Sequence, residues 1–365
     1  MNEPKISVVI PVYNRKTYIQ DCVNSVLNQT FQDFDIVIRD DGSKDGSAEL
    51  VEEVYAKEIS AGKIKLFRNG ENRGEYRTVR QLLESDATGK YIHILHSDDV
   101  FLPYALQHVY EIAEKTNADV VHSIGNLNGP ADRTLNPDSL KPRIHDARPV
   151  KQIVVMPDDP KFRFAEWAIK GTFCDIQYNL FSKKFIRENE LMFDPSNFGL
   201  NLFLLFWLMK AKVFVKTPAL YYVRRESPNS ITNRPTDSLK HVNGYVSAMM
   251  RFSRMLDDLL PRIKFFSDNP DLKRFVKFKF MTEFEFHEIT RRQFYKDGVS
   301  PELWEAVESA FRKYLGDENA FYPAILFTWM QSVQFGRDPY QIMLQQALKS
   351  LEDSAPPPQR YELAA

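Results

Sequence analysis

The chain has 365 residues, and its 48 Lys and Arg nearly balance its 49 Asp and Glu, which leaves a formal net charge of −1. At about 150 residues per domain this length predicts two or three domains, and a charge so close to zero argues against nucleic acid as the main partner. The two cysteines, Cys22 and Cys174, cannot build a disulfide framework and indicate a reducing compartment.

The first 125 residues alternate between short β-branched runs and segments with helical periodicity. We expect strands at 6–10, 34–39, 64–67, 91–95 and 119–122. We expect helices from about 17 to 27 and at 47–59, 78–83 and 104–115, with Ser47 as the N-cap of the second. Strands that alternate with helices predict an α/β fold with a mostly parallel sheet that helices cover on both faces.

The periodicity is lost between residues 125 and 161, which predicts a long irregular loop. A helical pattern follows at 162–169, then a strand-like stretch at 175–181 and an apolar helix at 202–209. After residue 233 only helical patterns remain. We therefore expect three regions, at 1–124, 125–233 and 234–365, the last of them helical.

Polar segments follow three of the predicted strands. They are residues 11–15 (PVYNR), 40–46 (DDGSKDG) and 96–99 (HSDD). Ligands of open parallel sheets bind beyond the carboxyl ends of the strands. Two Asp pairs at one edge would repel each other without a cation, and carboxylates suit Mg²⁺ or Mn²⁺ together with substrate phosphates. The alternative is that these acids form turns and helix caps.

Five segments in register over about 100 residues resemble the family 2 glycosyltransferases, inverting enzymes of the GT-A fold. The segments are 7–14 (SVVIPVYN), 25–31 (SVLNQTF), 40–46, 72–74 (NRG), and 89–92 (GKYI) with Asp98-Asp99 behind it. The resemblance extends over about residues 5–232 and is strongest over 5–103. It implies a GT-A-type, Rossmann-like domain that binds a nucleotide sugar in residues 1–124 and an acceptor in residues 125–233.

The resemblance also implies roles for individual residues. Pro11, Tyr13 and Asp41 would line the base and ribose pocket, with Asp41 accepting a hydrogen bond from the base. Asp98, with Asp99 beside it, would bind the Mn²⁺ or Mg²⁺ that holds the diphosphate. The remaining donor-binding candidates are Asn14, Arg80, His96, Ser97 and Arg224, of which Arg80 follows a spacing one residue longer than the family's. Tyr222, Arg224 and residues 227–231 resemble the loop that closes over the phosphates.

Two positions depart from the family pattern. His96 stands where the first Asp of an Asp-x-Asp motif is usual. Asn201 stands where the family carries the Asp that acts as general base, and losing a general base typically costs about 10²–10⁴-fold in rate. Either Asp194 or Asp175 serves instead, or the correspondence slips in this segment, or catalysis is weakened.

The helical region after residue 233 lies beyond the resemblance. Residues 262–280 mix basic side chains with phenylalanines, as a helix at an anionic membrane surface does. An ordinary amphipathic helix with its Phe face packed inward is the simpler explanation. The aromatic residues further on fit either a core or a homodimer surface.

The sequence thus predicts a metal-dependent hexosyl- or related transferase. It would move a sugar from a nucleotide diphosphate to a glycan or lipid-linked hydroxyl acceptor with inversion, in surface polysaccharide or glycoconjugate synthesis. The alternative is a nucleotide-sugar-binding scaffold or partner subunit with weakened catalysis. The sequence shows no signal-peptide pattern, and its longest apolar run is far shorter than the ~20 residues that span a bilayer. We therefore expect a cytoplasmic protein, with peripheral contact to the inner face of the membrane left open.

Overall fold

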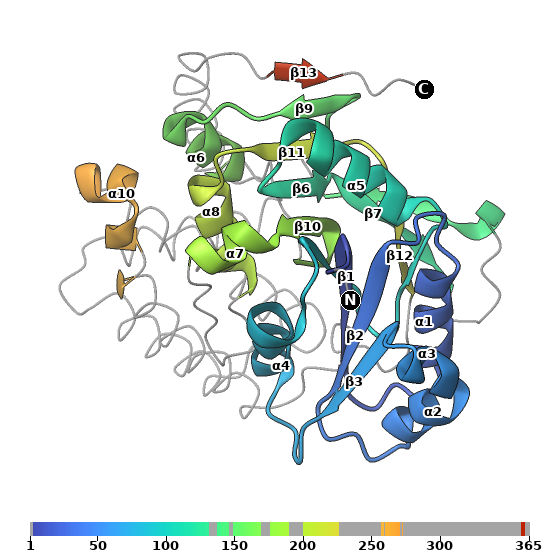
Figure 1. The fold of residues 1–365 in the computed structure, drawn as a ribbon. Helices are drawn as coiled ribbons and strands as arrows, with labels where there is room; N and C mark the ends of the chain where they lie inside the picture. The colour runs from blue at the N-terminus through green and yellow to red at the C-terminus, as the bar shows by residue number, and fades with distance from the viewer. Residues whose placement is uncertain are drawn as a thin grey trace, which may run out of the picture. The chain divides into compact units, whose positions relative to one another are not determined.

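The structure is a computed structural model with two compact units, residues 1–230 with 355–365 and residues 231–354 (Figure 1). It describes residues 3–130, 137–145, 149–168, 176–189, 200–225, 257–258, 260–270, 272 and 359–361. The expected bases Asp175 and Asp194 lie outside these residues, as does most of the predicted helical region.

Nine strands of the described residues form the main sheet of the first unit, in the order β13-β9-β11-β6-β10-β4-β1-β2-β3. The strands are β1 (Ile6–Val12), β2 (Phe34–Asp40), β3 (Ile64–Arg68), β4 (Tyr91–Ile94), β6 (Val120–Ser123), β9 (Ile153–Val155), β10 (Asn179–Ser182), β11 (Phe214–Thr217) and β13 (Gln359–Tyr361). Strands β4, β1, β2 and β3 pair in parallel, whereas β10 runs antiparallel to both β4 and β6. The predicted largely parallel sheet is confirmed, with antiparallel strands at β10 and at β9.

The seven residues of β1 are all buried, as a central strand covered on both faces requires. Helices α1 (Ile19–Leu27), α2 (Ser47–Val54) and α3 (Ala56–Ser60) lie on one side of β1–β3, and α4 (Glu75–Gln81) lies on the other (Figure 1). Helix α1 buries Ile19, Cys22, Val23 and Val26, which is the apolar face that the periodicity predicts. Helix α5 (Ala105–Thr116) follows β4 and leads into β6.

Two details of the predicted helices are wrong, and a third predicted helix is longer than expected. The helix expected over 47–59 breaks at Tyr55, whose backbone is not helical and whose hydroxyl donates to Asn24 of α1 at 2.8 Å, and α2 and α3 are separate helices. The N-cap of α2 is Gly46, with φ of +84°, and Ser47 is the first helical residue. The predicted helix around 78–83 begins earlier, at Glu75, and continues as a π-helical turn over Leu82–Asp86.

The expectation of an irregular loop over 125–161 is wrong. This segment forms β7 (Gly125–Gly129), β8 (Lys141–Ile144) and β9. With β5 (Val100–Phe101) and β12 (Tyr222–Arg225), β7 and β8 build a second sheet in the order β5-β12-β7-β8. The sequence GNLNG of β7 has little intrinsic strand preference, and pairing with β8 and β12 stabilises it instead. At Gly125 a side chain would collide with the carbonyl oxygen of Arg143.

The described residues of the first unit also form the helices α6 (Pro160–Ala168), α7 (Lys183–Glu188) and α8 (Leu200–Lys210), and α6 and α8 confirm helical structure near the two predicted positions. In the second unit the structure describes a 3₁₀ turn at Leu260–Arg262 and α10 (Lys264–Asp268), in which Phe266 is buried and Lys264 is exposed. Within the described ranges, no helix has both the length and the apolar character needed to cross a bilayer.

Candidate functional site

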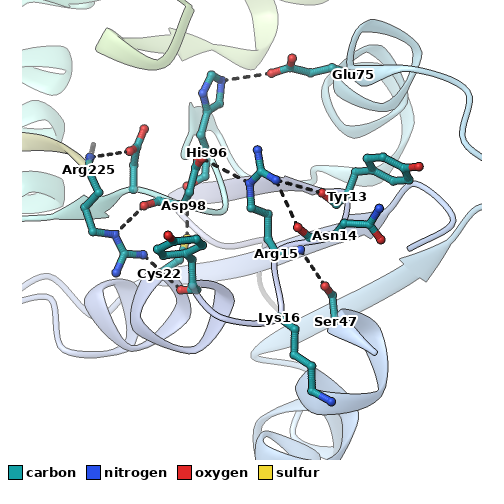
Figure 2. Close-up of polar contacts among 12 residues, drawn as sticks. Tyr13, Asn14, Arg15, Lys16, Cys22, Ser47, Glu75, His96, Asp98 and Arg225 are labelled. Carbon is teal, nitrogen blue, oxygen red and sulfur yellow. Dashed lines mark hydrogen bonds and ion pairs between the residues drawn. The ribbon is translucent and has the colours of Figure 1, made fainter. Parts of the chain in front are cut away.

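Three loops meet where the parallel strands β1, β2 and β4 end. Val12, the last residue of β1, pairs with Asp40, the last residue of β2, and β4 lies on the other side of β1. The loops therefore begin at the same edge of the sheet, which is where ligands of such folds bind. Figure 2 shows residues from the loops after β1 and β4 in contact there.

The loop after β1 is fastened to the loop after β2 by reciprocal hydrogen bonds. The backbone N–H of Asn14 donates to Ser43 Oγ at 2.9 Å, and Asn14 Oδ1 accepts from the backbone of Lys44 at 2.8 Å. The backbone N–H of Arg15 donates to Ser47 Oγ at 2.9 Å. Asn14 has a φ of +52°, a left-handed conformation that Asn tolerates better than most residues. The two loops thus form one bonded unit.

Asp41 organises the loop that leads into α4. Its Oδ1 accepts from Asn69 Nδ2 at 2.8 Å and from the backbone of Arg73 at 3.0 Å, and its Oδ2 accepts from the backbone of Gly74 at 2.9 Å. The side chain is buried. A carboxylate offers about four acceptor positions, and these hydrogen bonds use three of them. The predicted contact with a nucleotide base would therefore be made by a carboxylate already fixed in place.

Asp98 is the acid that faces the loop after β1. Its Oδ2 lies 3.2 Å from Nε of Arg15, and its side chain is 19% exposed (Figure 2). Nη1 of Arg15 also donates to the carbonyl oxygen of Asn14 at 3.1 Å. Asp98 is therefore a partly exposed carboxylate at the edge of the site, with a guanidinium as its partner.

Asp99 points into the protein instead. Its Oδ2 accepts from the Tyr222 hydroxyl at 2.6 Å, and its Oδ1 accepts from the backbone N–H of Arg225 at 2.9 Å. Burial, and then the nearby charge of Asp98, raise the pKa of Asp99 to about 6. The carboxylates of the pair have different surroundings, and the surroundings of Asp98 suit an added ligand better.

His96 approaches an acid that the sequence did not single out. Its Nε2 lies 3.5 Å from Oε1 of Glu75, the first residue of α4. Its backbone N–H donates to the Tyr222 hydroxyl at 3.3 Å, and its carbonyl oxygen accepts from the buried thiol of Cys22 at 3.5 Å. The neighbouring Ser97 is buried as well. His96 therefore belongs to the same loop cluster as Asp98.

The other predicted donor residues lie at different places. Pro11 is in the buried strand β1, and Tyr13 is 43% exposed at the start of the following loop. Arg80 is half exposed on α4 and pairs with Glu84, with 2.9 Å between Nε and Oε2. Arg224 is partly buried on β12. Arg80 thus pairs within its own helical segment rather than with the loop cluster.

Arg225 is the main residue that sequence reasoning missed. Its guanidinium is fully buried, and its Nε donates to the backbone carbonyl of Asp98. An alternating pattern over 222–225 would have placed Tyr222 and Arg224 on one face and Arg225 on the other. No strand is predicted there from the sequence. On the acceptor side, Asn201 is the second residue of α8, and the placement of its side chain is not described.

The described residues contain no group of three or more His, Cys, Asp and Glu arranged to hold a metal ion. Mg²⁺-type ions are often held by one or two carboxylates, with substrate phosphates and waters completing the coordination. Asp98, a partly exposed carboxylate at the strand ends, fits that kind of site.

These observations place the chain among the Rossmann-like α/β proteins whose ligand site lies at the carboxyl ends of parallel strands. Within this class, residues 7–187 match the model of glycosyl transferase family 2, and this part of the chain belongs to that family. The match begins in β1 and ends in α7, and it includes β2 to β10 and the three loops that follow β1, β2 and β4.

Two relatives are glycosyltransferases by name. Glycosyltransferase GlyG of Streptococcus pneumoniae serotype 4 is 35% identical over 121 residues, which are 33% of this chain and 38% of that protein. The GalNAc(5)-diNAcBac-PP-undecaprenol beta-1,3-glucosyltransferase of Campylobacter jejuni is 30% identical over 128 residues, 34% of this chain and 38% of that protein. The chain thus spans less than half of the length of either relative.

A solved structure covers nearly the whole chain. Residues 1–349 of S. aureus TarS, in complex with UDP-GlcNAc, superimpose with a TM-score of 0.63 at 16% identity, over 96% of this chain and 91% of that one. At this identity the likeness establishes the fold. The GT-A-type fold predicted from the sequence is confirmed.

Proposed function

We propose that the protein is a glycosyltransferase that moves a sugar from a nucleotide diphosphate to a hydroxyl acceptor. The observation that carries the proposal is the placement of Asp98, a partly exposed carboxylate at the ends of the parallel strands of a family 2 domain. Asp41 and Tyr13 are the residues that we assign to the base, and His96 and Ser97 are those that we assign to the ribose side.

A divalent cation, Mn²⁺ or Mg²⁺, would stabilise the charge that develops on the departing diphosphate. Asp98 would hold this cation. When no cation is bound, the guanidinium of Arg15 neutralises the carboxylate of Asp98. Asp99 is a weaker candidate ligand, because both of its oxygens accept hydrogen bonds within the fold. Arg224 lies at the end of β12, from which the following segment would reach the phosphates.

Inversion requires that the acceptor oxygen attack the anomeric carbon as the bond to the diphosphate oxygen breaks. A base must take the proton of the acceptor hydroxyl. Asn201 cannot do so as an amide, and we assign this task to Asp194 or Asp175. The name of the Campylobacter relative supports a lipid-linked acceptor and a role in glycoconjugate or surface polysaccharide synthesis. Such an acceptor favours a cytoplasmic protein at the inner face of the membrane.

A second candidate is a scaffold that binds the nucleotide sugar without transferring it. Asn201 favours it, because the family's acid is absent at that position. Homodimerisation through residues 234–365 would suit either function.

Incubation with a panel of nucleotide sugars, Mn²⁺ and mixed acceptors, with release of nucleoside diphosphate as the readout, tests the proposal. We expect turnover with one donor and a loss of at least about 100-fold in Asp98→Asn, as losing a stabiliser of the developing charge predicts. Glu53→Gln, an exposed acid of α2, is the matched control and should retain activity. Tight donor binding without turnover, in the presence of lipid-linked acceptors, would favour the scaffold.

A further inference from the structure

Arg225 occupies an unusual position for an arginine, because none of its side chain is exposed. Its guanidinium contacts three residues in two segments of the chain, the start of α1 and the turn at Asp98. Nη1 lies 2.9 Å from Oδ2 of Asp21 on α1, Nη2 donates to the carbonyl oxygen of Tyr18 at 3.2 Å, and Nε donates to the carbonyl oxygen of Asp98. The guanidinium carbon also lies 5.1 Å from the centre of the Tyr18 ring. Burial of this charge is thus offset by three acceptors and an aromatic face.

Arg225 holds the Asp98-Asp99 turn from within. Nε binds the main chain of Asp98, while the backbone N–H of Arg225 binds the carboxylate of Asp99 at 2.9 Å. Tyr222, on the same strand, binds the other oxygen of that carboxylate at 2.6 Å. With its main chain and its neighbour both fixed, Asp98 has few directions in which its own carboxylate can point.

The two arginines around Asp98 act on different atoms. Arg15 pairs with the carboxylate from the loop after β1, whereas Arg225 binds the backbone from β12 (Figure 2). An incoming ligand can replace Arg15, because that ion pair is partly exposed. It has no access to Arg225, which is buried. Arg225 is therefore part of the frame of the site.

We propose that Arg225 is a positioning residue of the donor site: it orients Asp98 toward a cation bound by the nucleoside diphosphate, and it does so by joining α1 to the Asp98-Asp99 turn. This inference rests on the proposed function. Residues behind metal ligands typically change metal affinity by about 10- to 100-fold when they are replaced.

The three acceptors explain why arginine is required. A guanidinium offers donors in a fixed planar fork, and here Nε, Nη1 and Nη2 each reach a different partner. The ammonium of lysine is a point charge, and it cannot serve Asp21, Tyr18 and Asp98 at once. Arg225→Lys therefore keeps the positive charge and removes the planar arrangement of donors that reaches all three acceptors.

The experiment measures Mn²⁺ binding by electron paramagnetic resonance in the full chain, with a saturating nucleoside diphosphate chosen from UDP, GDP and CDP. We expect Arg225→Lys to weaken Mn²⁺ binding by about 10-fold or more. Nucleotide binding without metal should change by less than about 3-fold, because Arg225 is buried away from ligands. Asp21→Asn, which removes one partner of Arg225, should weaken Mn²⁺ binding in the same direction by a smaller factor.

Arg163→Lys controls for the loss of a buried arginine. Arg163 is also buried, and it donates to the carbonyl oxygens of Pro157, Leu208 and Lys212. Its variant should lower the melting temperature and leave Mn²⁺ affinity unchanged. If Arg225→Lys fails to fold, Asp21→Asn decides the question.

If Arg225→Lys folds and binds Mn²⁺ as tightly as the wild type, this inference is overturned and the proposed function is not. If Arg225→Lys does not fold, wild-type Mn²⁺ affinity in Asp21→Asn has the same consequence. A wild-type protein that binds none of the nucleotides with Mn²⁺ would overturn the proposed function and this inference together.

Discussion

The guanidinium of Arg15 and the carboxylate of Asp98 form an ion pair between the loops that follow β1 and β4, with 3.2 Å between Nε and Oδ2. Their side chains are 22% and 19% exposed. The pair thus places a positive charge beside the acid that we assign to the cation. Any divalent ion that binds Asp98 must share this carboxylate with Arg15 or displace the Arg15 guanidinium from it.

Replacing Arg15 by Gln should therefore strengthen the binding of Mn²⁺ alone, without nucleotide. We expect about a two- to fivefold gain, because ion pairs with partial exposure are worth roughly 0.2–1 kcal/mol. Titration calorimetry with Mn²⁺ measures the effect, and Arg187→Gln, an exposed arginine of α7, is the control. Weaker Mn²⁺ binding in Arg15→Gln would show that Arg15 does not compete for Asp98.

Two buried histidines of the central sheet should make the fold sensitive to acid. Burial lowers the pKa of His93 on β4 to about 4, and burial followed by the charge of Lys216 lowers that of His122 on β6 to about 3, from 6.5. The unfolded chain binds a proton at each of these histidines more readily than the folded protein does. The stability that the two neutral histidines contribute is therefore complete above pH 6.5, and it is lost as the pH falls toward 4 for His93 and toward 3 for His122. At pH 5 we expect each to reduce the free energy of unfolding by roughly 2 kcal/mol.

Urea unfolding between pH 4 and pH 7 measures this dependence. The double variant His93→Gln with His122→Gln should show a flatter profile over that range, even where its stability at pH 7 is lower. A profile as steep as that of the wild type would mean that other groups cause the loss of stability in acid.

Lys216 and Glu166 form a buried ion pair between β11 and α6, with 2.6 Å between Nζ and Oε2. Their side chains are 3% and 5% exposed. Removing one charge leaves the other buried, so Glu166→Gln should cost about 3–5 kcal/mol of unfolding free energy. The apolar double replacement Lys216→Met with Glu166→Leu should recover most of this loss. Chemical denaturation measures both, and a double variant as unstable as the single one would contradict the explanation.

The parallel half of the sheet could be predicted because its strands are buried on both faces and therefore have short apolar sequences. The loops behind them were also identifiable, because the ends of parallel strands must share one edge. Asp98 and Asp41 were found in this way. The strand β7 could not be, because its Gly and Asn residues acquire strand structure only by pairing with β8 and with the distant β12.

The role of Arg225 was hidden for a related reason. Its partners Tyr18, Asp21 and Asp98 lie more than 100 residues away in the sequence, and only the register of β12 against β5 and β7 turns its side chain toward them. The opposite environments of Asp98 and Asp99 depend on the same strand, since Tyr222 and Arg225 bind Asp99. Local sequence gave both acids the same expected role as metal ligands.

The central claim is that Asp98 stands at a nucleoside diphosphate site, and calorimetric titration of the full chain tests it most directly. The titrants are UDP, GDP and CDP, each with and without Mn²⁺, against the wild type, Asp98→Asn and Glu53→Gln. We predict that one nucleotide binds with an affinity that Mn²⁺ increases, that Asp98→Asn loses this increase, and that Glu53→Gln keeps it. Equal Mn²⁺-dependent binding by Asp98→Asn and the wild type, or no binding of any nucleotide, would contradict the claim.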